Sequence, residues 1–131
     1  MTYGSETWGI KKAQEKKMDV AEMKMLRWAC GHTRLDHIEN EEIRRRVRVT
    51  EVHKKIQEKR LRWYGHVKRR DEDHVTRRTL EMELGGRRAR GRPKRRWMDC
   101  VLEDMAQKRL RRRDVADRSR WNEVTRNSDP T

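Results

Sequence analysis

Residues Thr50–Arg70, TEVHKKIQEKRLRWYGHVKRR, form the longest amphipathic stretch of the chain. The spacing of the apolar side chains predicts one helix, with Thr50 as its N-cap and a single apolar stripe. The stripe consists of Val52, Ile56, Trp63 and Val67. The opposite side is expected to carry Lys54, Lys55, Arg62 and Arg69. Such a helix offers one face to a core and one face either to anions or to ordinary solvation.

Weaker helical patterns surround this stretch. We expect helices at residues 10–30, 40–47, 74–82 and 93–110, and a last helix that Asp114 caps and that holds Trp121 and Val124. The apolar face of the first helix is predicted to hold Gln14, Met18, Ala21, Met25, Trp28 and Ala29. No segment alternates like a β-strand. The chain is therefore expected to be mostly α: a small bundle of several amphipathic helices joined by basic loops, only partly stable in isolation.

This pattern divides the chain into five parts. They are an extended entry segment (1–9), a helical region with a basic face (10–84), a basic Gly/Arg loop (85–93), C-terminal helices (94–126) and a frayed tail (127–131).

The composition favours a polyanionic partner. The chain has 131 residues, of which 32% are hydrophobic and 44% charged, and its net charge is +14. So few apolar residues support only a small core, and such compositions border on disorder. A positive excess of this size repels itself when the chain is compact, and nucleic acid is the commonest partner that relieves it. The alternative is a soluble basic protein without a particular partner.

The segment Gly85–Trp97, GGRRARGRPKRRW, concentrates this charge before a predicted helix. If Pro93 is the first helical residue, Arg92 is a poor N-cap and the first N–H groups lack a local acceptor. Cations in the first turn also oppose the helix dipole, whereas a phosphate would satisfy both groups. The expected phosphate-binding residues are Arg87, Arg88, Arg90, Gly91, Arg92, Lys94, Arg95 and Arg96. The alternatives are a nuclear-import signal and a solvated loop.

Other functional classes find little support in the sequence. Cys30 and Cys100 form neither a disulfide framework nor a zinc pattern, and Asp71–Asp73 fits a charged turn better than a metal site. No apolar run is long enough to span a membrane, and no signal peptide is evident. We expect an intracellular protein, nuclear or cytoplasmic, with no cofactor, metal, membrane or small-molecule substrate.

Several short segments resemble the region that follows the polymerase core in LINE-type, non-LTR retrotransposon reverse transcriptases. In chain order they are Tyr3–Trp8 (YGSETW), Leu26–Gly31 (LRWACG), Asn40–Arg44 (NEEIR), Leu61–Val67 (LRWYGHV), Gly91–Trp97 (GRPKRRW) with Asp99, and Asp117-Arg118 with Trp121. Together they cover nearly the whole chain. The resemblance implies a helical thumb and C-terminal extension that act with template RNA and target DNA, with the missing polymerase core as a further partner.

The same resemblance argues against catalysis by this chain alone. The parent family is an RNA-directed DNA polymerase whose palm aspartates hold metal ions, and no aromatic-x-Asp-Asp segment occurs here. We therefore expect a non-catalytic fragment that grips RNA or DNA through phosphates, with the preference between them open. Two alternatives remain. One is an AT-hook-like chromatin protein, because Arg90-Gly91-Arg92-Pro93 resembles that motif; the other is a non-functional remnant of a decayed retroelement.

One glycine of the central stretch needs its own explanation. Gly65 costs a helix about 1 kcal/mol relative to alanine and lies near Arg62 and Arg69 on the helical wheel. It is expected either to let a nucleic-acid backbone approach closely or to break or kink the helix.

Overall fold

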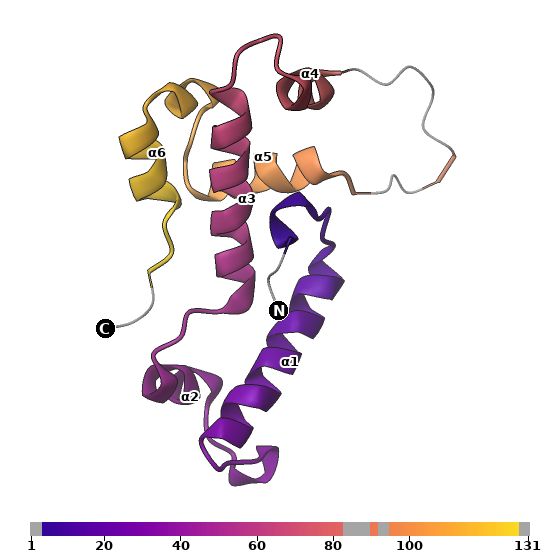
Figure 1. Cartoon of the computed structure of the whole chain (residues 1–131). Helices are drawn as coiled ribbons and strands as arrows, with labels where there is room; N and C mark the ends of the chain where they lie inside the picture. Colours follow the sequence, from indigo (N-terminus) through magenta and orange to yellow (C-terminus); the bar gives the residue numbers. More distant parts are fainter. Residues whose placement is uncertain (1–3, 83–89, 92–94, 129–131) are drawn as a thin grey trace.

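The computed structural model describes residues 4–82, 90–91 and 95–128 and confirms a mostly helical chain. The α-helices are α1 (Lys12–Ala29), α2 (Asn40–Val47), α3 (Val52–Lys68), α4 (Val75–Glu81), α5 (Trp97–Gln107) and α6 (Arg118–Thr125). Short 3-10 helices are η1 (Ser5–Thr7), η2 (Arg34–Asp36) and η3 (Arg112–Ala116). No β-strand occurs in these residues. Helix α3 is central and packs against η1, α1, α4, α5 and α6 (Figure 1).

Helix α3 is buried on more sides than its apolar stripe predicts. Val52, Ile56 and Val67 are buried as expected, and Trp63 is half-buried. Leu61 and Tyr64, which lie outside the predicted stripe, are also fully buried. The reason is that neighbouring elements surround α3, so residues on several sides of it lose contact with water.

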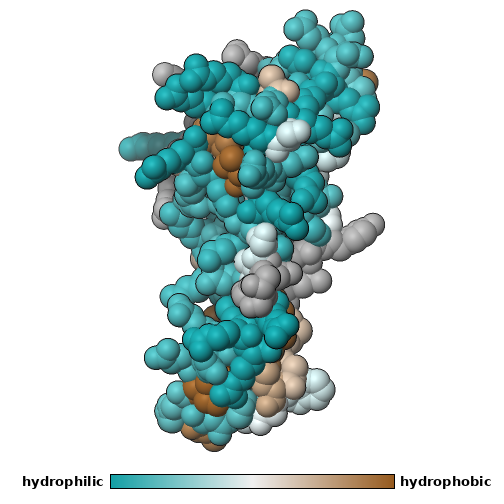
Figure 2. Space-filling view, turned by 90° about the vertical axis from the view of Figure 1, so that its left-hand side faces the viewer, coloured by the Kyte–Doolittle hydropathy of each residue, from teal (hydrophilic) through white to brown (hydrophobic). Residues whose placement is uncertain are grey.

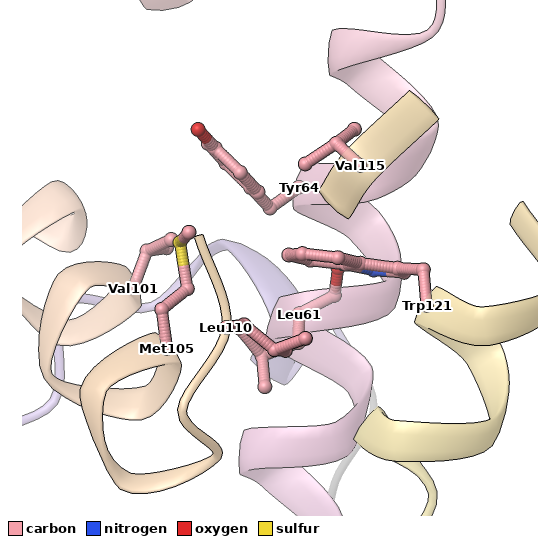
Figure 3. Packing of buried hydrophobic residues seen from close by; sticks show 7 residues of the cluster. All are labelled: Leu61, Tyr64, Val101, Met105, Leu110, Val115 and Trp121. Carbon is pink, nitrogen blue, oxygen red and sulfur yellow. The ribbon is translucent and has the colours of Figure 1, made fainter. Parts of the chain in front are cut away.

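One end of α3 lies in the main apolar cluster of the molecule, which we call the aromatic core (Figure 3). Its members are Leu61, Tyr64, Val101, Met105, Leu110, Val115 and Trp121. The rings of Tyr64 and Trp121 lie 6.0 Å apart in a tilted arrangement, and the Trp121 indole N–H donates to the Leu61 carbonyl at 3.0 Å. The large indole is therefore buried with its polar atom satisfied.

The C-terminal helix forms as expected, but a different aspartate caps it. Asp117 accepts a hydrogen bond from the Arg120 N–H at 3.1 Å at the start of α6. Asp114, the predicted cap, instead accepts from the Arg111 N–H at 2.7 Å and closes η3.

The predicted apolar face of α1 is wrong. Of that set only Met18 packs against a core cluster, whereas Met25 and Trp28 are 51% and 84% exposed. The buried residues of α1 are Glu22 and Met23. The side of α1 that carries Glu22 faces the rest of the molecule because residues of α2 and α3 donate hydrogen bonds to the Glu22 carboxylate. These contacts cannot be predicted from the sequence of α1 alone.

The entry segment contains a helical turn where we expected extended chain. Gly4 has a φ of 67°, in the region that favours glycine, and η1 follows it directly. The Trp97 indole N–H donates to the Glu6 carbonyl at 2.7 Å, which ties this turn to the start of α5.

Candidate nucleic-acid interface

Only part of the predicted phosphate-binding loop lies within the described residues. Arg87, Arg88, Arg92 and Lys94 lie outside them. Arg90 and Gly91 are exposed, and Gly91 has a φ of 117°.

The start of the following helix differs from the prediction. Helix α5 begins at Trp97 rather than Pro93, with Arg96 as its N-cap. The Arg96 N–H donates to the Asp99 carboxylate at 2.8 Å, and an acid in the first turn also suits the helix dipole. The N–H of the N-cap therefore has a local acceptor, and the expected helix start at Pro93 is wrong. An acid three residues after the N-cap is a sequence signal that identifies this start.

Arg95, which precedes α5, is held by residues of that helix. Its guanidinium forms an ion pair with Glu103 and donates to the Cys100 thiol sulfur at 3.1 Å. The Cys100 hydrogen bond and, next, that of Glu103 raise the pKa of Arg95 above its ordinary value. Arg95 is thus held against α5, whereas the Arg96 side chain beside it is exposed.

The structure separates the four cations predicted on α3. Lys54 forms an ion pair with Glu51 at 3.1 Å, and its carbonyl accepts from the Asn127 side-chain amide at 2.7 Å. Lys55 donates to the Asn127 carbonyl at 2.5 Å, so both lysines lie near the C-terminal segment. Arg62 and Arg69 lie in a different place, a groove between α3 and α6.

We call this depression, of about 460 Å³, the α3–α6 groove. It is lined by Glu6, Lys59, Arg62, Trp63, His66, Arg69, Arg118 and Asn122. In the upper part of the face that carries α6, hydrophilic residues predominate around one hydrophobic patch (Figure 2). Sequence reasoning missed Arg118 as a member of this site, because the packing of α6 beside α3 joins residues far apart in the chain. It also missed Lys59, which lies on α3 itself.

Two arginines of the groove repel each other. Burial and, second, the charge of Arg118 lower the pKa of Arg69. The Arg69 Nε donates to the Val115 carbonyl at 2.8 Å, but its buried Nη2 has no hydrogen-bond partner in the described structure. Arg118 is exposed and likewise has no hydrogen bond or ion pair within the described ranges. An anion bound beside the two guanidinium groups would relieve this repulsion.

Unlike Arg69 and Arg118, most cations of α2, α3 and α4 in the described structure form ion pairs with acidic side chains. Examples are Arg44 with Glu22, Arg46 with Glu42, Arg60 with Asp104, Arg62 with Glu58, and Lys68 with Glu81. Arg69 and Arg118 therefore differ from the paired charges around them.

Gly65 serves packing rather than either predicted role. It is buried within a continuous helix. A Cβ atom at this position would lie 2.5 Å from Nε1 of Trp121 and 2.9 Å from its Cδ1, closer than real atoms approach. Glycine is needed here because the Trp121 ring lies directly on the α3 backbone.

The segments that carry the retrotransposon resemblance contact one another in pairs. Trp97 donates to the Glu6 carbonyl, Arg27 donates to the Asn40 side chain at 2.7 Å, and Trp121 packs on Gly65. Each contact joins two of the quoted segments that are far apart in sequence. These residues therefore hold the helices together.

Comparison with known proteins adds no family. No family model matches the chain, and no curated protein or solved structure is significantly similar to it. Across residues 4–82, 90–91 and 95–128, no His, Cys, Asp and Glu side chains form a group that could hold a metal ion. None of the helices described is both long and apolar enough to cross a membrane.

Proposed function

We propose that the chain is a nucleic-acid-binding module that holds phosphates in the α3–α6 groove. The observation that carries the proposal is the juxtaposition of Arg69 and Arg118, two cations without acidic partners in the described residues. The groove also contains Lys59 and Arg62 and has a single acidic lining residue, Glu6. The net charge of +14 favours a polymer of negative charge over a small anion.

Arg96, an exposed cation before α5, extends this surface. Trp63 lines both the groove and a neighbouring apolar hollow, and Arg96 lines that hollow as well. A strand bound in the groove could therefore pass Trp63 toward Arg96. In this proposal Lys54, Lys55 and Arg95 act in folding, since intramolecular partners already hold them.

We further propose that the module is the C-terminal extension of a LINE-type reverse transcriptase and that its role is binding rather than catalysis. The support is the order of the resembling segments and their pairwise contacts in the fold. The test is the genomic sequence upstream of the Met1 codon. A continuous reading frame that encodes a paired-aspartate palm supports this origin, and an unrelated upstream frame contradicts it.

Binding itself is tested by fluorescence anisotropy of a labelled oligonucleotide over a salt series. We expect affinity to fall steeply with salt. The Arg118→Gln variant should flatten the slope of log K against log [salt] by about 0.7–0.9, the value for one phosphate contact. Arg118 is exposed, so this substitution spares the core.

The matched control is Arg34→Gln, which removes the same charge from an exposed arginine of η2. We expect it to leave the slope nearly unchanged. Equal changes in both variants would show that charge alone, and not the groove, controls binding. Absence of binding to any RNA or DNA at low salt would refute the proposed function.

A further inference from the structure

The α3–α6 groove contains an aromatic pair as well as cations. Trp63 and His66 stack with ring centroids 5.6 Å apart and planes inclined by 29°. His66 is exposed and Trp63 half-buried. Both line the groove, together with Arg62 of the same helix and Arg69 at its C-cap. A stacked pair of rings beside cations is the combination that proteins use to bind unpaired bases.

Resting on the proposed function, we infer that the groove binds a nucleotide of a single strand. Its base extends the Trp63–His66 stack, and its phosphates lie at the arginines of the groove. A duplex presents phosphates but hides the faces of its bases within its own stack, so it could use only the cations. The inference therefore adds a strand preference to the phosphate binding already proposed.

The hydrogen bonding of His66 suits this role. Arg70 Nη2 lies 2.9 Å from His66 Nε2. Because a guanidinium can only donate, this hydrogen bond requires Nε2 as the acceptor, which leaves the ring N–H on Nδ1. Arg70 thus fixes the orientation of the imidazole and leaves its Nδ1–H for a base or a phosphate.

Trp63 is reachable from two sides. Besides the groove, it lines an apolar hollow of about 890 Å³ between α3, α4 and the start of α5. Val67, Leu80 and Trp97 also line this hollow. A strand that crosses Trp63 therefore meets cations on one side and apolar surface on the other, as alternating phosphates and bases require.

The test compares three labelled oligonucleotides of one length by anisotropy at one salt concentration: a single-stranded oligothymidylate, its duplex, and an abasic strand. The abasic strand keeps the phosphates and lacks the bases. We expect the chain to bind the oligothymidylate about tenfold more tightly than the abasic strand, which is the effect of one stacked base. We also expect it to bind the duplex more weakly than the single strand.

Two variants connect this preference to the rings. Trp63→Leu and His66→Ala should each bring the affinity for oligothymidylate close to that for the abasic strand. His66 is exposed, so His66→Ala keeps the test decisive if Trp63→Leu fails to fold, which circular dichroism reports. The matched control is Trp28→Leu, an exposed tryptophan on α1, which should retain the full preference.

The outcomes separate the two proposals. Equal binding of the ordinary and abasic strands by the parent chain overturns the stacking inference but leaves phosphate binding intact. Equal loss of the preference in Trp28→Leu and Trp63→Leu overturns it as well. Failure to bind any of the three oligonucleotides, or tighter binding of polyglutamate than of nucleic acid, refutes the proposed function itself.

Discussion

The two ends of α3 are held in place by different physical forces. Toward its C-terminal end, Leu61 and Tyr64 of α3 are buried in the aromatic core with Trp121 of α6 and residues of α5 and η3. At its N-terminal end the apolar cluster contains only Ile10, Val52 and Ile56 with part of Met18. We call the structure around this second end the α1–α2 half.

Polar contacts replace apolar burial in the α1–α2 half. The Glu22 carboxylate lies 2.6 Å from Arg44 Nη1 and accepts from the Val52 N–H at 3.3 Å, so one acid joins α1, α2 and the start of α3. Asp19 lies 2.9 Å from His53 Nδ1. Hydrophobic side chains show on the surface at this end of the molecule (Figure 2). Since apolar burial is the main stabilising term in proteins, the α1–α2 half should be the less stable of the two.

The substitution Trp121→Ala should have the largest effect. Trp121 is fully buried in the aromatic core, and replacing such a tryptophan by alanine costs about 3–5 kcal/mol. This is comparable to the whole stability of a small domain with few apolar residues. We expect urea denaturation, followed by circular dichroism, to show a largely unfolded chain.

The same variant tests whether the two halves are separate. Because the α1–α2 half depends on the position of α3, we expect its helices to be lost as well. Retention of protected amides in α1 and α2 after hydrogen exchange would show that this half is stable without the aromatic core, and the ranking of the two halves would be reversed.

Next in size is Glu22→Gln. The substitution removes a charge that is 2.6 Å from Arg44 in a mostly buried site, and hydrogen bonds to charged groups contribute about 1.5–3 kcal/mol. Hydrogen exchange measured by mass spectrometry should become faster in α1 and α2 and remain unchanged in α5 and α6. The control is Glu41→Gln, an exposed acid of α2 without an ion pair in the described residues. Uniform acceleration over all helices would contradict the division into two halves.

The substitution Gly65→Ala tests the contact between α3 and α6. Helix propensity alone predicts stabilisation by about 1 kcal/mol. We expect the opposite sign, a loss of about 1–3 kcal/mol, because the new methyl group would overlap the Trp121 ring. Urea denaturation gives the sign. In a Trp121→Phe background, whose ring is smaller, the loss should shrink; an unchanged loss would show that the overlap is not with Trp121.

These contacts show where sequence reasoning succeeds and where it fails. The central helix was predictable because Val52, Ile56 and Val67 follow the helical period. The orientation of α1 was not, because Glu22 is buried only through its contacts with Arg44 and Val52. A charged residue in that position has the sequence pattern of a solvated face.

The candidate site divides in the same way. Arg62 and Arg69 were predictable as cations on one face of α3, since that face follows from local periodicity. Arg118 was not, because it enters the groove only when α6 packs on α3 through Trp121 and Gly65. The sequence shows which residues are charged, whereas the residues that surround each charge are set by the tertiary fold.

A smaller effect on the free energy of unfolding, one that depends on pH, is expected from replacing Asp104, which lies on α5 beside the aromatic core. Its carboxylate lies 2.8 Å from Arg60 Nη1, and both side chains are buried. Burial outweighs the attraction of Arg60 and raises the pKa of Asp104 from 3.8 to about 6. The folded chain therefore holds this proton to higher pH than the unfolded chain does, and the stability it contributes is lost as pH rises from about 4 to about 6.

The measurement is the difference in unfolding free energy between the parent chain and Asp104→Asn at several pH values. Other acids titrate in both proteins and cancel in this difference. We expect the parent chain to lose stability relative to Asp104→Asn as the pH rises from 4 to 6, and the difference in unfolding free energy to be constant above that range. A gain in the stability of the parent chain relative to Asp104→Asn over this range would show that the charge of Arg60, and not burial, determines the pKa of Asp104.

The smallest effect should come from Trp28→Leu, in contrast to Trp121→Ala. Trp28 is 84% exposed, so leucine removes almost no buried area, and exposed substitutions usually change stability by less than about 0.5 kcal/mol. Urea denaturation should give nearly the parent midpoint. A loss comparable to that of Glu22→Gln would mean that the indole packs against the α1–α2 half in solution. The orientation of α1 would then be the one predicted from its apolar residues, and the polar network around Glu22 could no longer be what holds that half in place.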